Sequence, residues 1–135
     1  MDRKQLIRQA LDMLPKSYAP YSHHHVGAAL LCADGTVYTG MNIENAAFSP
    51  TICAERTAIF KAVSEGHREF TEIVICGGMN GVPSTYCSPC GVCRQVMREF
   101  CDPKTFKIIL ARSEEDYKEY TLEELLPLSF GPENL

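Results

Sequence analysis

The sequence lacks the features that mark a membrane-spanning, a secreted or a polyanion-binding chain. No uninterrupted apolar stretch approaches the roughly 18 residues that a membrane-spanning helix requires, and no apolar leader region follows the charged residues at the N-terminus. The 13 lysine and arginine residues are scattered, and the 17 acidic residues outnumber them to give a net charge of −4. We therefore expect a cytoplasmic protein that has no membrane partner and no nucleic-acid partner.

The chain also lacks linkers, low-complexity segments and repeats of the solenoid type. Its 135 residues are therefore expected to form a single domain over residues 1–135. A hydrophobic fraction of 45% with 22% charged residues is ordinary for a globular protein. A chain of this length can bury a core without the help of disulfides.

Cysteine, by contrast, is abundant. Seven cysteines are many for a reducing compartment, and their number is odd. Such enrichment points to metal binding or catalysis more than to disulfides. Cys32, Cys76 and Cys101 fall in apolar runs and are expected in the core.

Hydrophobic periodicity predicts a helix and a hairpin in the first part of the chain. Apolar residues between 3 and 14 form one helical stripe, which Pro15 ends. The apolar segment 26–32 is followed by Asp34-Gly35 and then by the short segment 36–38, a pattern typical of a β-hairpin. Residues 42–52 are expected to form a loop.

Two matched units follow. Helical stripes begin at Ala54 and at Val92, and continuous apolar runs at 73–76 and 108–110 are typical of strands covered on both faces. Residues 121–124 match a capping box that opens a short final helix. The order α-β-β-α-β-α-β-α predicts an α/β fold of three layers, in which helices cover both faces of a central β-sheet (αβα). The sheet is expected to be mixed because of the hairpin, with its later strands parallel.

Two short segments carry the candidate chemistry, namely Cys53-Ala54-Glu55 and the run from Pro89 through Cys90 to Cys93. Each lies at the predicted start of a helix, where the dipole and free backbone N–H groups stabilise a thiolate. Three sulfurs from two helix tips can form three corners of a tetrahedron. The open fourth corner takes water, which is the arrangement of a catalytic zinc site and not of a closed structural one.

Glu55 is the candidate proton carrier. It lies roughly 200° around a regular helix from Cys53, so both can reach one site only if Cys53 precedes the regular helix. A carboxylate that is not a metal ligand can move protons during hydrolysis. Three thiolates leave Zn²⁺ with a net charge of −1, which opposes acidification of water. Arg56 can donate hydrogen bonds to the thiolates and so withdraw part of this charge.

The cysteine pattern also fits other kinds of site. Cys53, Cys90 and Cys93 also suit a closed structural zinc site or unrelated buried thiols. The pair Cys90 and Cys93 alone suits a dithiol oxidoreductase, which leaves Cys53 and Glu55 without a role. Cys87 keeps the three-residue spacing and competes as a ligand. A zinc module that binds nucleic acid or protein should bring a second ligand pair and a basic patch, and the sequence has neither.

Cys-Ala-Glu-Arg at 53–56 and Ser-Pro-Cys-Gly-Val-Cys-Arg-Gln at 88–95 resemble the motifs of the small three-cysteine, homotetrameric cytidine deaminases. Deaminases of this class use a zinc ion and a glutamate that is not a zinc ligand. The resemblance extends over nearly the whole chain from residue 17. It includes the segments 18–22, 26–30, 42–46, 125–127 and 130–132.

The resemblance implies a cytidine deaminase-like fold and one Zn²⁺ per subunit, held by Cys53, Cys90 and Cys93. It implies hydrolytic deamination of free cytidine and deoxycytidine to uridine and deoxyuridine plus ammonia, as in pyrimidine salvage. Water activated by zinc attacks C4, and Glu55 shuttles protons.

The resemblance also assigns substrate contacts. Asn42 and Glu44 hydrogen-bond the ribose 3′-hydroxyl, and backbone groups of Ala54 and Ser88 hold the pyrimidine edge. Phe130 reaches over the ligand of a neighbouring subunit in a homotetramer with shared active sites. A carboxylate beside the sugar suits an uncharged nucleoside, whereas deaminases of nucleotides or RNA should carry basic residues there.

One departure from the family pattern lies at His24, in the triplet 23–25, where relatives usually carry phenylalanine. An imidazole still stacks on a ring, but it is smaller and more hydrated, which predicts weaker nucleoside binding without loss of chemistry. The triplet also resembles a metal clip, although neighbours on a strand point to opposite faces. His67, just past Gly66, is expected at the surface.

Overall fold

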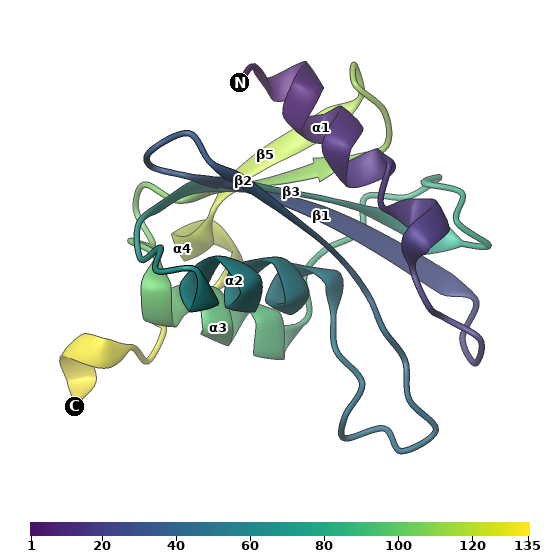
Figure 1. The fold of residues 1–135 in the computed structure, drawn as a ribbon. Coiled ribbons are helices and arrows are strands. Elements are labelled where there is room, and N and C mark those ends of the chain that lie inside the picture. The colour runs from purple at the N-terminus through teal and green to yellow at the C-terminus, as the bar shows by residue number, and fades with distance from the viewer.

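The computed structural model describes all 135 residues as a mixed five-stranded sheet with helices on both faces (Figure 1). None of the helices has the length and apolar character that crossing a membrane requires. The elements in chain order are α1 (Arg3–Leu11), β1 (His24–Cys32), β2 (Val37–Met41), α2 (Ala54–Ser64), β3 (Phe70–Met79), α3 (Gly91–Phe100), β4 (Lys107–Ala111), β5 (Tyr117–Thr121) and α4 (Leu122–Leu125), with short 3-10 turns at Leu14–Lys16 and Pro132–Asn134.

The strand order is β2-β1-β3-β4-β5. Only β3 and β4 are parallel; β1 pairs antiparallel with β2 and β3, and β5 pairs antiparallel with β4. The predicted α/β fold with a mixed central sheet is therefore confirmed. The parallel pair comes from the β3-α3-β4 unit, whose crossover helix brings the chain back in the same direction.

The three layers follow from the alternation of side chains along the strands. In β3, Ile73 and Ile75 join the larger core cluster under α2 and α3, whereas Val74 and Cys76 join the smaller cluster under α1. Both faces of the strand are covered, which is why its apolar run is continuous. Cys32, Cys76 and Cys101 are buried, as expected.

Several boundaries differ from the prediction. The first helix ends at Leu11 instead of continuing to residue 14, and Pro15 lies in the 3-10 turn that follows. β3 is longer than the segment 73–76 because its ends, which contain Phe70 and two glycines, also pair with β1. The strand β5 was not predicted, since its residues are mostly exposed at the sheet edge and show no apolar run.

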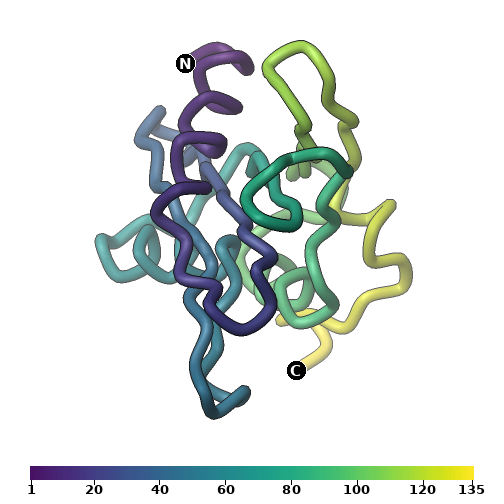
Figure 2. Tube along the Cα trace, turned by 90° about the vertical axis from the view of Figure 1, so that its right-hand side faces the viewer, coloured from purple at the N-terminus to yellow at the C-terminus, as the bar shows by residue number.

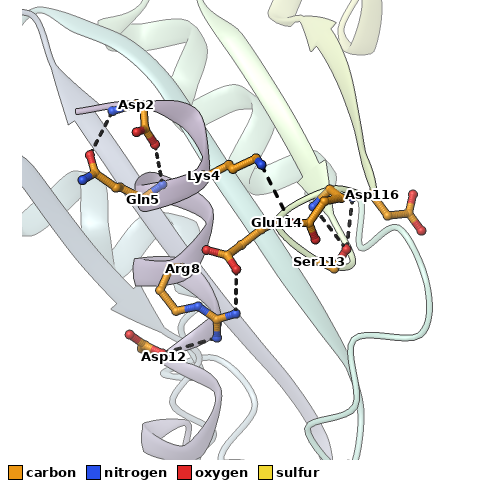
Figure 3. A network of polar contacts seen from close by, with 9 residues as sticks. Asp2, Lys4, Gln5, Arg8, Asp12, Ser113, Glu114 and Asp116 are labelled. Carbon is orange, nitrogen blue, oxygen red and sulfur yellow. Dashed lines mark hydrogen bonds and ion pairs between the residues drawn. The ribbon is translucent and has the colours of Figure 1, made fainter.

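Polar contacts at the surface join α1 to the turn between β4 and β5 (Figure 3). Arg8 lies 3.3 Å from Glu114 and 3.8 Å from Asp12, and Lys4 lies 3.9 Å from Glu115. Exposed pairs of this kind contribute about 0–1 kcal/mol each. They therefore orient α1 on the sheet, while the buried residues beneath it supply most of the stabilisation.

The fold places the starts of α2 and α3 side by side. Gly40 lets the start of α2 pack closely on β2, because a Cβ atom there would lie 2.3 Å from the carbonyl oxygen of Ala54. The loop from residue 42 to residue 53, which leads into α2, extends away from the sheet in both views (Figures 1 and 2). The candidate cysteines lie where these helices begin.

Candidate metal centre

Cys53 and Cys90 both lie at the N-caps of helices. Cys53 precedes α2 with extended backbone angles (φ −83°, ψ 158°), and Cys90 precedes α3 in the same way (φ −69°, ψ 168°). The Cys90 sulfur also accepts a hydrogen bond from the backbone N–H of Cys93 at 3.4 Å. Cys53 thus precedes the regular helix, which is the condition that allows Glu55 to share its site.

The sulfur atoms of Cys53, Cys90 and Cys93 form a compact triangle. The Sγ atoms of Cys53 and Cys90 are 3.8 Å apart, those of Cys90 and Cys93 are 3.4 Å apart, and all three lie within 4.8 Å of one another. Zinc–thiolate bonds of about 2.3 Å in a tetrahedron require sulfur–sulfur separations of about 3.8 Å. The triangle therefore fits one zinc ion with little movement.

No fourth histidine, cysteine, aspartate or glutamate joins this cluster. Cys87, the competing candidate, contacts Nε2 of His24 at 3.8 Å instead. Three protein donors leave one coordination position open, which is the ligand count of a catalytic zinc site.

Arg56 and the neighbouring thiols stabilise a thiolate at Cys53. A hydrogen bond from Cys93 is the largest cause, and together with Arg56 it lowers the pKa of Cys53 to about 5. The same contact raises the pKa of Cys93, so the first proton is lost from Cys53. A terminal guanidinium nitrogen of Arg56 lies 3.3 Å from the Cys53 sulfur. Arg56 is thus placed to withdraw charge from the Cys53 sulfur.

Glu55 is buried on the first turn of α2, with 4% of its surface exposed. Burial raises the pKa of its carboxyl group to about 7, and the charge of Cys53 adds to this rise. No cation forms an ion pair with Glu55. A buried carboxyl group without such a partner costs folding free energy, and such groups are concentrated at functional sites.

Asn42 fastens the start of β1 and keeps one donor free. Its Oδ1 accepts hydrogen bonds from the Ser17 hydroxyl and, at 2.9 Å, from the backbone N–H of Val26, and its Nδ2 donates to the carbonyl oxygen of His24 at 2.8 Å. The backbone donor at Val26 fixes the orientation of the amide. One of the two Nδ2 hydrogens is left for an external acceptor.

Glu44 folds back onto the turn at residues 21–22. Its carboxylate accepts from the backbone N–H groups of Tyr21 (3.0 Å) and Ser22 (3.1 Å) and from the Ser22 hydroxyl. The Ser22 hydrogen bond is the main reason why the pKa of Glu44 is lowered. A cavity of about 250 Å³ adjoins this carboxylate and is lined also by Asn45, Phe48 and Thr51. Glu44 is therefore an anion at neutral pH with lone pairs left for a hydroxyl donor.

Sequence comparison relates the whole chain to one family. A model of the "cytidine and deoxycytidylate deaminase zinc-binding region" matches residues 1–109. Cytidine deaminases of Halalkalibacterium halodurans and Sporosarcina psychrophila are 48% and 46% identical, with all of this chain aligned to 98% and 96% of those proteins. The chain belongs to the cytidine deaminase family.

A solved structure of a cytidine deaminase from Burkholderia pseudomallei matches the fold with a TM-score of 0.87 and 41% identity, covering 96% of this chain and all of that one. The predicted family, fold class and hydrolase class are thus confirmed, as is a zinc-binding deaminase region. The oxidoreductase and zinc-module interpretations find no support in these matches.

The structure of this cytidine deaminase family member separates Phe130 from the cysteines. Gln95 donates to the carbonyl oxygen of Phe130 at 2.9 Å, and Arg98 donates to Ser129 at 2.7 Å, so the C-terminal segment lies along the second half of α3. Cys90 caps the other end of that helix. At about 1.5 Å per residue, Gln95 and Arg98 lie roughly 8–12 Å along the helix from Cys90. Phe130 is 59% exposed.

Sequence reasoning missed one residue that organises the site. Arg94 donates to the carbonyl oxygens of Pro89 (2.9 Å) and Leu125 (2.6 Å) and to the hydroxyl of Ser88 (2.9 Å). It therefore ties the segment that carries Cys90 to the end of α4. Its position one residue after Cys93, on the first turn of α3, was the available signal, since a side chain there can reach back over the helix start.

Proposed function

We propose that the chain catalyses the hydrolytic deamination of free cytidine and deoxycytidine to uridine and deoxyuridine with release of ammonia. The observation that carries this proposal is the triangle of thiols from two helix starts, beside a buried carboxyl group and without a fourth protein donor. The family to which the chain belongs supports the same reaction.

Cys53, Cys90 and Cys93 are proposed to hold one zinc ion. When bound, zinc lowers the pKa of water to near neutrality and so makes hydroxide available for addition to C4 of the cytosine ring. Arg56 holds the Cys53 thiolate by its hydrogen bond at 3.3 Å and moderates the negative charge of the sulfur ligands.

Glu55 is proposed to move the protons. Hydrolysis consumes one water, adds a proton at ring N3 and expels the C4 amino group as ammonia after a further protonation. The Glu55 carboxylate accepts one proton from water and passes it to N3. It then takes the remaining proton from the hydroxyl group now on C4 and delivers it to the departing nitrogen, which leaves as ammonia and leaves a carbonyl group at C4. Its burial keeps it out of bulk solvent and raises its pKa toward neutrality, which suits a group that must both accept and donate.

The remaining contacts orient the nucleoside. Asn42 offers its free Nδ2 hydrogen, and Glu44 offers its remaining lone pairs, to the ribose 3′-hydroxyl. The backbone groups of Ala54 and Ser88, which flank Cys53 and Cys90 on the two helix starts, hold the pyrimidine edge. His24 packs against the base.

Phe130 is proposed to act in the active site of a neighbouring subunit of a homotetramer. Its exposure and the attachment of its segment to the far half of α3 support a role outside its own site. The exposed Phe60 and Val92 add apolar surface on α2 and α3 for such an assembly. We also propose a single domain over residues 1–135 and a cytoplasmic location.

The nucleoside assignment is tested by comparing cytidine with cytidine 5′-monophosphate. We expect kcat/KM to be roughly tenfold or more lower for the monophosphate, because its charge is repelled by Glu44 and solvent screens only part of that repulsion. Ammonia release with both substrates gives the ratio of the two kcat/KM values. Glu44→Gln should bring this ratio closer to one. A preference for the monophosphate in the unmodified chain would overturn the assignment.

Replacement of His24 by phenylalanine tests the packing against the base. We expect His24→Phe to lower KM for cytidine by about 2–10-fold at nearly constant kcat, since a larger apolar ring adds about 0.5–1.5 kcal/mol of aromatic packing. Because His24 contacts the Cys87 sulfur at 3.8 Å, Cys87→Ser serves as the control for loss of that contact. An unchanged or higher KM in His24→Phe contradicts the proposed role.

A further inference from the structure

A second group of metal-ligating side chains lies outside the candidate active site. The thiol of Cys32, the carboxylate of Asp34 and the imidazole of His67 place their donor atoms within 4.8 Å of one another. Cys32 ends β1, Asp34 lies in the turn before β2, and His67 follows the end of α2. The two groups lie at opposite ends of α2, because Cys53 precedes its first residue and its 11 residues span about 17 Å.

Backbone hydrogen bonds hold the segments that carry the three donors. The backbone N–H of Cys32 donates to the carbonyl oxygen of Thr36 at 2.8 Å. Oδ1 of Asp34 accepts from the backbone N–H of Thr36 at 3.0 Å, which leaves Oδ2 facing His67. The backbone N–H of His67 donates to the carbonyl oxygen of Ala62 at 3.0 Å, and the Tyr38 ring packs edge-on against the imidazole at 5.3 Å. The donors are therefore positioned by hydrogen bonds and contacts that binding of an ion would leave intact.

The imidazole has no hydrogen-bond partner within the chain. Nδ1 of His67 and Oδ2 of Asp34 are 3.7 Å apart, which exceeds a hydrogen bond. Bonds of about 2.0–2.1 Å from zinc to nitrogen and oxygen in a tetrahedron require a separation of about 3.3 Å. The observed spacing thus suits two ligands of one ion better than it suits a direct contact.

The surroundings also favour a cation. An open cleft of about 320 Å³, lined by residues 33–34 and 66–69, adjoins the group and gives water access to a further coordination position. The carbonyl end of α2 carries the negative end of the helix dipole. Arg68 is the cation in the cleft, and its guanidinium donates to backbone carbonyl oxygens of Val63 and His67 rather than to Asp34.

We propose that Cys32, Asp34 and His67 bind a second zinc ion, which ties the turn between β1 and β2 to the end of α2. A donor set of one thiolate, one imidazole and one carboxylate selects zinc or a similar transition metal over magnesium and calcium, which prefer oxygen ligands alone. The site has no part in the proposed deamination. Its effect is on the stability of the chain, since an ion that binds only the folded state stabilises that state.

The test measures the zinc content of the full chain by elemental analysis after equilibrium dialysis against zinc. We expect about two zinc ions per chain in the parent and about one in each of the variants Cys32→Ser, Asp34→Asn and His67→Asn. The site has only three protein ligands, so the loss of any one of them should abolish zinc binding there. Matched controls are Cys101→Ser, another buried cysteine, and Glu69→Gln, an acidic residue of the same cleft; both should keep two. Added zinc should also raise the Tm of the parent by more than it raises the Tm of His67→Asn, because the variant can gain stability only from zinc at the active site.

About one zinc per chain in the parent, or a second zinc that survives both Asp34→Asn and His67→Asn, overturns the proposal. Both of these side chains are partly exposed, so the two variants carry the test if Cys32→Ser does not fold. Ammonia release from cytidine is measured on the same samples. If the parent released no ammonia from cytidine, the proposed function would be contradicted, whereas the proposed second zinc site would not be affected by that result.

Discussion

Glu55→Gln is expected to keep its zinc and to lose turnover of cytidine by about 10²–10⁴-fold, the contribution that a positioned proton carrier makes. The amide has the shape of the carboxyl group but cannot accept and return a proton. Replacement of a buried ionisable group by a neutral one should not lower the free energy of unfolding. Ammonia release gives kcat, and elemental analysis gives the zinc content.

The control for this variant is Glu65→Gln, which makes the same chemical change on an exposed residue just after the same helix. It should keep both zinc and turnover. If Glu55→Gln retained activity within about tenfold of the parent, Glu55 would not be the proton carrier. If Glu55→Gln lost its zinc, the Glu55 carboxylate would be needed to maintain the zinc site, and the loss of turnover would not show that it carries protons.

Cys90→Ser is expected to lose the active-site zinc and measurable turnover. Without the metal, the pKa of water rises far above neutrality, so hydroxide at neutral pH falls by several orders of magnitude. Serine preserves the N-cap, since its oxygen can accept the hydrogen bond that the Cys90 sulfur now accepts from Cys93. The helix should therefore remain, and the melting transition of zinc-free protein should change little.

Cys87→Ser is the matched control, because Cys87 lies three residues earlier in the same segment and outside the triangle of sulfurs. It should keep the active-site zinc. Zinc content and ammonia release are measured for both variants. Loss of that zinc in Cys87→Ser together with its retention in Cys90→Ser would reverse the ligand assignment.

The sequence predicted those parts of the fold in which local pattern and burial agree. The runs at 73–76 and 108–110 are covered on both faces, so their continuous apolar character identifies them as strands. β5 was missed because an edge strand of exposed residues needs only its hydrogen bonds to β4, which leave no trace in hydropathy.

The candidate metal centre was predictable because its ligands lie at helix starts, where spacing and cap position limit the geometry. The contact of Arg94 with Leu125 was not predictable, since it depends on where the chain returns some 30 residues later. The same holds for His67, which was expected only at the surface. Its approach to Asp34 follows from the pairing of β1 with β2 and the position of α2 upon them.

The proposed reaction requires a zinc ion with three sulfur ligands and one open position. X-ray absorption at the zinc edge, measured on protein loaded with one zinc per chain, tests this most directly. We predict about three sulfur neighbours near 2.3 Å and one oxygen neighbour near 2.0 Å. Four sulfur neighbours, or a histidine nitrogen in the fourth position, would contradict the account.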